Sequence, residues 1–185
     1  MMEAELKFHA PDLEGLERAL VGMGASPVSE AVESDTYYRH PCRDLAASDE
    51  ALRIRTWSAG DGVERNYITY KGPRVSSATG KSRIERECPI GDPREIEAIL
   101  LALGFRQAGR VRKTRKTYSH QEIHICLDHV EGLGGFAELE IRVEEDELAP
   151  AVERLRALAS RLGLRDDIRI SYLEMLLEGN GDTRS

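Results

Sequence analysis

Residues 2–8 read Met-Glu-Ala-Glu-Leu-Lys-Phe, in which charged and apolar side chains alternate strictly after the first residue. Because successive side chains of a β-strand point to opposite faces of its sheet, Glu3, Glu5 and Lys7 would share one face. The apolar residues between them would share the other. This stretch therefore predicts a strand that is apolar on one side and entirely charged on the other.

The same two-residue period recurs along the chain and indicates seven further strands. They are predicted over residues 32–38, 51–57, 65–71, 81–88, 110–118, 122–130 and 136–143. Three other segments have helical periodicity and end near a glycine, which commonly terminates a helix. They lie over residues 13–23, 94–103 and 147–162, and a fourth, shorter helix is predicted over residues 171–177.

Most of the predicted strands follow one another without a helix between them, which argues against parallel β-α-β winding. We therefore expect an α+β fold: a closed eight-stranded antiparallel β-barrel with helices packed outside. The 185 residues, 41% of them hydrophobic, suit one domain over residues 1–178. Residues 75–80 are interpreted as a loop between strands, and the polar residues 179–185 as a frayed C-terminal tail.

Composition argues against several classes of protein. No apolar run approaches the roughly 20 residues of a membrane-spanning helix, so we expect a soluble, cytoplasmic protein without a membrane partner. A net charge of −7 disfavours a nucleic-acid binder, although a local basic patch can still hold a small anion. The three cysteines are an odd number without zinc-site spacing, which argues against both a disulfide framework and a zinc site.

The charged faces of the predicted strands carry doublets of one sign. These doublets are Glu3 and Glu5, Arg53 and Arg55, Glu85 and Glu87, Lys113 and Arg115, and Glu138 and Glu140. An ordinary solvated sheet face is the alternative, but such a face is rich in Ser, Thr, Gln and Lys. If the apolar face lies outward beneath the helices, the charged face lines a lumen, where unpaired charges are costly. Such a lumen requires ions to fill it.

Two kinds of ion suit these side chains. Carboxylates brought together from distant strands form an oxygen-rich site that fits Mg²⁺ or Mn²⁺. Arginine and lysine side chains beside them bind phosphate oxygens, and arginine can do so with two hydrogen bonds. Together these residue types predict the binding of a polyanion with its divalent metals.

The N-terminal Glu3-x-Glu5-x-Lys7 pattern resembles the hallmark of the CYTH, or triphosphate tunnel, family. Further motifs follow in the order of that family: Asp35-Thr36-Tyr37-Tyr38, Leu52-Arg53-Ile54-Arg55, Tyr70-Lys71-Gly72-Pro73, Arg83-Ile84-Glu85, Arg112-Lys113-Thr114-Arg115, Leu127-Asp128 and Glu138-Leu139-Glu140. Residues 123–138 and the pair Ser171-Tyr172 most resemble class IV adenylyl cyclases. The resemblance implies an eight-stranded antiparallel barrel, a requirement for Mg²⁺ or Mn²⁺, and often a homodimer.

The resemblance and the charge of each side chain together suggest roles. We expect the metals to be bound by Glu3, Glu5, Asp128, Glu138 and Glu140. We expect the triphosphate to be held by Lys7, Arg53, Arg55, Lys71, Arg83, Lys113 and Arg115. The expected catalytic set is Glu5, Lys7, Lys113 and Glu138, with Glu85 and Glu87 as secondary carboxylates.

Aromatic and imidazole side chains near these motifs receive a simpler interpretation. Tyr37, Tyr38 and Trp57 are interpreted as packing residues, because aromatic side chains in strands usually serve packing. A hydroxyl contact or a base-stacking contact with the ligand is the alternative. His124 and His129 are interpreted as structural or solvated.

Three functions are compatible with this sequence. The leading interpretation is an adenylyl cyclase that converts ATP to 3′,5′-cyclic AMP and pyrophosphate. A hydrolase of inorganic or nucleoside triphosphate is the alternative within the same fold. A non-catalytic module that binds polyphosphate or nucleotide is the alternative from another class. The products formed from ATP would separate the three.

Overall fold

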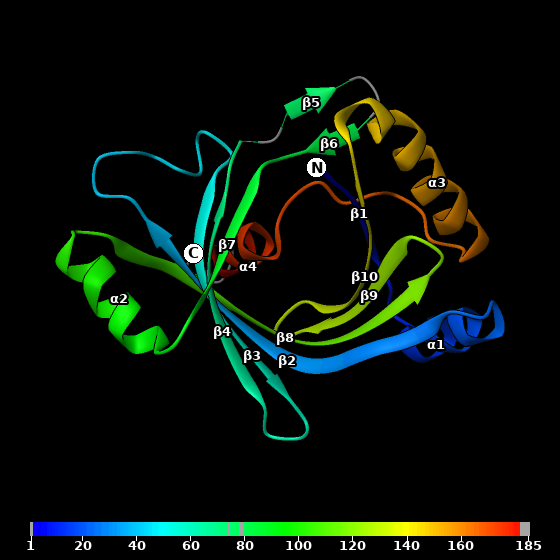
Figure 1. Cartoon of the computed structure of the whole chain (residues 1–185), viewed down its shortest axis with the longest axis horizontal. Coiled ribbons are helices and arrows are strands. Elements are labelled where there is room, and N and C mark those ends of the chain that lie inside the picture. Colours follow the sequence, from blue (N-terminus) through cyan, green and yellow to red (C-terminus); the bar gives the residue numbers. More distant parts are fainter. Residues whose placement is uncertain (1, 74, 78–79, 182–185) are drawn as a thin grey trace.

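The computed structural model describes residues 2–73, 75–77 and 80–181. Its main feature is an eight-stranded antiparallel sheet that curls into a half-barrel (Figure 1). In spatial order the strands are β1 (Met2–His9), β10 (Gly134–Val143), β9 (Ile123–Val130), β8 (Arg106–His120), β2 (Ser26–Arg39), β3 (Ala51–Ala59), β4 (Glu64–Lys71) and β7 (Glu85–Ile90). With its helices, this sheet confirms the α+β class.

The four helices are α1 (Leu13–Gly22), α2 (Pro93–Ala102), α3 (Leu148–Arg161) and α4 (Tyr172–Gly181), and a short 3-10 turn at Glu145–Glu147 precedes α3. Asp12 and Asp92 cap α1 and α2 by accepting hydrogen bonds from backbone N–H groups of the first turn. The helix α4 extends four residues beyond the predicted end at 177 and includes the start of the expected tail. Residues 182–185 lie outside the described part. None of the helices in the described ranges combines the length and apolar character needed to cross a bilayer.

The sheet is open, which corrects the expectation of a closed barrel. Its edge strands, β1 and β7, are each hydrogen-bonded to one neighbouring strand within the described residues. The strand predicted over residues 81–88 is interrupted, because β6 (Gly80–Ser82) pairs with β5 (Val75–Ser77) in a separate hairpin. Residues 75–80, expected as a loop, therefore include strand residues, and 78–79 lie outside the described residues. The hairpin lies against β1 (Figure 1), and its residues pair with each other rather than within the eight-stranded sheet.

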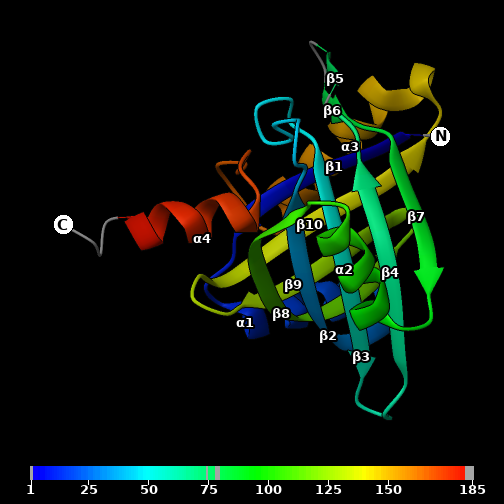
Figure 2. The same ribbon diagram turned by 90° about the vertical axis from the view of Figure 1, so that its left-hand side faces the viewer.

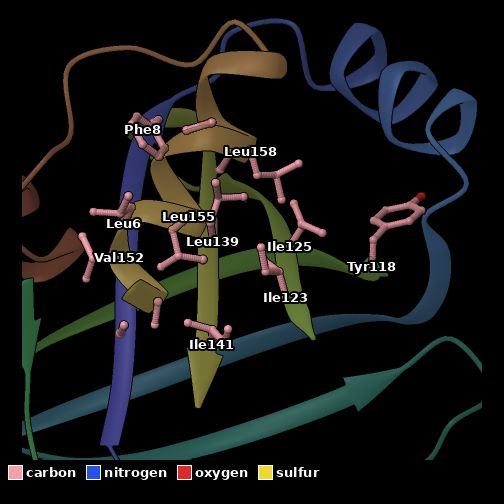
Figure 3. Close-up of a cluster of buried hydrophobic side chains, with 14 of the residues drawn as sticks. Leu6, Phe8, Tyr118, Ile123, Ile125, Leu139, Ile141, Val152, Leu155 and Leu158 are labelled. Atoms are coloured by element: carbon pink, nitrogen blue, oxygen red, sulfur yellow. The ribbon is translucent and has the colours of Figure 1, made fainter. Parts of the chain in front are cut away.

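The largest hydrophobic core lies on the outer face of β1, β10 and β9, beneath α1 and α3 (Figure 3). The apolar half of the β1 alternation faces this core, as Leu6 does. Leu139 and Ile125 are fully buried beside Leu155 of α3. A smaller core on the outer face of β2, β3 and β4 packs beneath α2. The two cores fix the opposite, charged face of the same strands on the concave side.

Helix α4 corrects the expectation that every helix packs outside, because it lies on the concave side (Figure 1), at one end of the sheet (Figure 2). Val111 and Phe136 belong to the inner face and pack against Tyr172, the first residue of α4. The helix approaches β8 closely at Gly109, where an added Cβ would lie 2.7 Å from Leu173 Cδ1. An apolar patch at one end of an otherwise charged face therefore docks this helix inside.

The substitution Leu155→Ala is expected to lower the free energy of unfolding by about 2–5 kcal/mol, because it leaves a cavity between α3 and the sheet. Chemical denaturation followed by circular dichroism measures this change. Leu103→Ala removes the same atoms at a position that is 64% exposed, and it should change the free energy by less than about 0.5 kcal/mol. Equal losses in the two variants would contradict the described core.

Candidate functional site

The concave face of the sheet holds a cavity of about 290 Å³ that is lined mainly by charged side chains. The structure brings together all but one of the side chains predicted for the site. Those on the cavity wall are Glu3, Glu5, Lys7, Arg53, Arg55, Lys71, Arg83, Glu85, Glu87, Lys113, Arg115, Glu138 and Glu140. These residues come from six strands and from the segment that precedes β7. For this reason the alternation of charged and apolar residues recurs along the sequence from residue 3 to residue 140.

Three carboxylates converge on the β1 and β10 side of the cavity. One oxygen from each of Glu5, Glu138 and Glu140 lies within 4.8 Å of the others. The strand register explains this, because Glu5 faces Glu140 and Lys7 faces Glu138 across the β1–β10 ladder. Three converging carboxylate oxygens are a donor set that suits a hard divalent cation.

The electrostatics of Glu140 show that negative charge accumulates at this point. Burial, together with the neighbouring Glu138, Glu5 and Glu3, raises the pKa of Glu140 to about 8, although Arg115 acts in the opposite direction. A carboxyl group of this kind takes up a proton or a metal ion more readily than an ordinary glutamate. The residues present therefore fit Mg²⁺ or Mn²⁺.

Two further predicted metal ligands lie elsewhere. Glu3 lines the cavity, but it accepts a hydrogen bond from Arg142 Nε at 3.2 Å and does not belong to the three-carboxylate group. Asp128 is fully buried behind the cavity wall. Both of its oxygens accept hydrogen bonds from cationic side chains, and its role as a metal ligand stays a prediction.

Asp128 holds Arg115 and Lys113 from the neighbouring strand. Its two oxygens accept hydrogen bonds from Arg115 Nε and Nη2, both at 2.6 Å, and Oδ2 lies 3.3 Å from Lys113 Nζ. Arg115 and Asp128 are direct partners in the β8–β9 register. Arg115 also donates to Glu138, and so links this cation pair to the three-carboxylate group.

A second buried aspartate holds the other basic doublet in the same way. Asp35 of β2 accepts hydrogen bonds from Arg55 Nε at 2.6 Å and Nη2 at 2.7 Å, and from Arg53 Nη1 at 3.3 Å. Burial alone would raise the pKa of Asp35, but Arg53 and Arg55 outweigh it and hold the pKa far below the usual value. The carboxylate is therefore charged and fixes both guanidinium groups.

Glu33 connects the two basic doublets. One of its oxygens, Oε2, lies 3.0 Å from Arg55 Nη2 and 3.3 Å from Lys113 Nζ. Sequence reasoning assigned no role to Glu33 or Asp35, although the signal was present. They alternate on one face of a predicted strand, as Glu3 and Glu5 do.

The opposite wall carries Lys71 and its partners. Glu85 lies 3.0 Å from Lys71 Nζ and 3.6 Å from Arg53 Nη2. Burial and the nearby Arg53 lower the pKa of Lys71. The other secondary carboxylate, Glu87, accepts a hydrogen bond from Thr69 at 3.1 Å.

Several lining residues were not predicted for the site. They come from the end of β2, from the loop and first residue of β3, and from the start of α4: Tyr37, Ala46, Asp49, Glu50, Ala51, Ser171, Tyr172, Leu173 and Glu174. Tyr37 lines the cavity in addition to packing, whereas Tyr38 packs beneath α2, as expected. The loop and α4 carry no two-residue alternation, so the pattern that found the strand residues could not find the residues there. Tyr37 does follow the alternation of β2 but was interpreted as a packing residue.

The charge of Glu33 generates a pH dependence of stability. Burial opposes the charged form, but Lys113, Arg115 and Arg55 outweigh it and lower the pKa of Glu33 to about 2. An unfolded glutamate titrates near about 4.3, so this stabilisation is complete above that pH and is lost as pH falls toward 2.

The Glu33→Gln variant should therefore lose stability less steeply than the wild type between about pH 4.5 and 2.5, by up to about 1.4 kcal/mol per pH unit. Guanidinium denaturation at a series of pH values measures the slope. Glu153→Gln is the control, since its side chain on α3 is 69% exposed. Parallel slopes for Glu33→Gln and the wild type would show that this carboxylate is not held as described.

Comparison with known proteins gives relatives that cover almost the whole chain. A Methanocaldococcus jannaschii protein named as a candidate adenylate cyclase is 33% identical over 178 residues, which are 95% of this chain and 98% of that protein. The adenylate cyclase CyaB of Aeromonas hydrophila is 32% identical over 164 residues, which are 88% of this chain and 81% of that protein.

Solved structures share the fold. The PH1819 protein of Pyrococcus horikoshii is 39% identical, with a TM-score of 0.88 over 96% of this chain and 99% of that one. HpAC1 of Hippeastrum, described by a dominant triphosphatase activity, is 21% identical, with a TM-score of 0.69 over 96% and 95% of the chains, and is alike in fold alone. Residues 1–172 match the CYTH domain. The chain therefore belongs to the CYTH domain family.

Proposed function

We propose that this protein is a divalent-metal-dependent adenylyl cyclase of class IV type, which converts ATP to 3′,5′-cyclic AMP and pyrophosphate. The observation that carries the proposal is one cavity in which the carboxylates of Glu5, Glu138 and Glu140 converge beside fixed cations. The two relatives with 33% and 32% identity, both named for adenylate cyclase, support the choice of reaction. A cytoplasmic homodimer completes the proposal, on the family resemblance alone.

The three converging carboxylates would hold Mg²⁺ or Mn²⁺. A divalent metal bound there would lower the pKa of the ribose 3′-hydroxyl and stabilise the departing pyrophosphate. Glu138 has a second role, because it lies 3.3 Å from Lys7 Nζ and accepts a hydrogen bond from Arg115. Glu138 would therefore hold Lys7 and Arg115, two of the proposed phosphate-binding cations, directly beside the proposed metal ligands.

The basic residues would bind the phosphate oxygens without large rearrangement. Arg55 and Arg115 are each held by an aspartate through two hydrogen bonds, which fixes the planes of their guanidinium groups. Donors fixed in this way stabilise developing negative charge more effectively than mobile ones. Arg53 Nε is buried and has no hydrogen-bond partner among the described residues, so this donor would be available to a bound anion.

Hydrolysis of inorganic or nucleoside triphosphate is the second candidate. Water would then attack the terminal phosphorus, and the same carboxylates and cations would serve that reaction. HpAC1, which shares this fold, is described by a triphosphatase activity, so the architecture is compatible with both reactions. A non-catalytic triphosphate-binding module is the third candidate.

Incubation with ATP and, separately, with inorganic triphosphate, each with Mg²⁺ or Mn²⁺, tests the proposal. Chromatography of the products is expected to show cyclic AMP and pyrophosphate from ATP, and no turnover after chelation of the metal. Orthophosphate from inorganic triphosphate without cyclic AMP would assign the protein to the hydrolases. Binding of triphosphate without any product would leave only the binding module.

The Glu138→Gln variant should lose metal-dependent turnover by on the order of 10²-fold or more, because a metal ligand beside the phosphate-binding cations is removed. Initial rates at saturating metal measure the effect, and thermal denaturation verifies folding. Glu17→Gln is the matched control: Glu17 also pairs with a lysine, Lys116, but on the outer face. A folded Glu138→Gln protein with the turnover of Glu17→Gln would overturn the metal assignment.

A further inference from the structure

Tyr172 is the first residue of α4, and local interactions fix its position. Ser171 Oγ accepts a hydrogen bond from the backbone N–H of Glu174 at 3.2 Å, and Glu174 Oε2 accepts one from the backbone N–H of Ser171 at 2.6 Å. This reciprocal pair is a capping box, which sets where the helix begins. The preceding segment is tied to β1, because the backbone N–H of Ile168 donates to the carbonyl of Lys7 at 2.7 Å.

The ring of Tyr172 lies against two lysines of the phosphate-binding set. Lys7 Nζ is 4.2 Å from the ring centroid, and Lys113 Nζ is 5.2 Å from it. The hydroxyl donates a hydrogen bond to Asp128 Oδ2 at 3.0 Å. Phe136 packs against the ring edge-to-face at a centroid distance of 5.0 Å. One side chain from the last helix therefore contacts cations held on β1 and on β8.

All of these groups are largely removed from water. Lys7 is 8% exposed, Lys113 is 4% exposed and Tyr172 is 6% exposed. An ammonium group is attracted to the negative face of an aromatic ring, and the attraction is stronger where both are desolvated. Burial and the carboxylates of Glu138 and Asp128 raise the pKa of the Tyr172 hydroxyl, which therefore remains a hydrogen-bond donor.

The ring competes with carboxylates for the same ammonium groups. Lys7 Nζ lies 3.3 Å from Glu138, and Lys113 Nζ lies 3.3 Å from Asp128. Without the ring, the carboxylates beside each lysine would be its main charged partners, and they would neutralise its charge. The attraction to a neutral ring holds the ammonium groups in place without cancelling their positive charge.

We propose that Tyr172 is a positioning residue of the triphosphate site, whose aromatic ring holds the ammonium groups of Lys7 and Lys113 toward the cavity. Helix α4 is then part of the anion-binding site rather than a separate terminal element. The inference rests on the proposed function for the identity of the ligand, but not on which reaction follows.

Binding of inorganic triphosphate with Mg²⁺, measured by calorimetry, tests this role without requiring turnover. Tyr172→Leu removes the ring and should weaken binding about tenfold, whereas Tyr172→Phe keeps the ring and should stay within about threefold of the wild type. Leu176→Ala is the matched control for the docking of α4, because Leu176 packs in the same apolar cluster but is not among the described residues that line the cavity. It should bind as the wild type does.

Three results from the variants would overturn the inference. Tyr172→Leu could bind triphosphate as tightly as the wild type, or Tyr172→Phe could be as weak as Tyr172→Leu, which would assign the effect to the hydroxyl. Leu176→Ala could weaken binding as much as Tyr172→Leu, which would assign it to helix docking. A wild type that binds triphosphate without forming product contradicts only the proposed enzyme, and the variants still decide the role of Tyr172. A wild type that does not bind triphosphate contradicts both.

Discussion

Asp128 and Arg115 face each other across β8 and β9, joined by two hydrogen bonds of 2.6 Å at a fully buried carboxylate. A lone charge at this depth would destabilise the fold, because desolvation of an ion is not offset without a partner. The concave face therefore has to pair its charges, and the strand register does so. Asp35 and Arg55 repeat the arrangement between β2 and β3. The two outer cores hold the strands so that these pairs meet.

Within this paired face, the β1–β10 ladder is a place where like charges meet. Glu5 lies directly opposite Glu140, and the pKa of Glu140 rises to about 8. Opposite charges at this position would have stabilised the sheet, so the arrangement costs stability in the absence of a cation. The excess of negative charge thus marks the part of the cavity proposed to bind a metal, and the pairs around it hold the cations proposed to bind the anion.

Alternation in the sequence was enough to predict the strands, their charged face and most of the cavity wall. It could not predict that residues 80–82 pair locally or that the sheet is open, because a hairpin and an edge strand have the same period. It also could not place Asp128, since the depth of a side chain behind the wall depends on its neighbours. The same alternation places Val111 and Phe136 on the inner face. Why these two inner residues are apolar is explained only by the packing of α4 against them.

The pairing of charges also affects how favourably a polyanion would bind in the cavity. Most of the basic side chains already have carboxylate partners, so an incoming triphosphate would meet negative charge from Glu5, Glu138 and Glu140 as well as positive charge. Divalent cations at those three residues would remove this repulsion and would themselves attract phosphate oxygens. In the proposed function, metal and triphosphate would therefore stabilise each other's binding in this cavity. A site with an excess of carboxylates can in this way be selective for a highly charged anion, because the anion binds favourably only together with its metals.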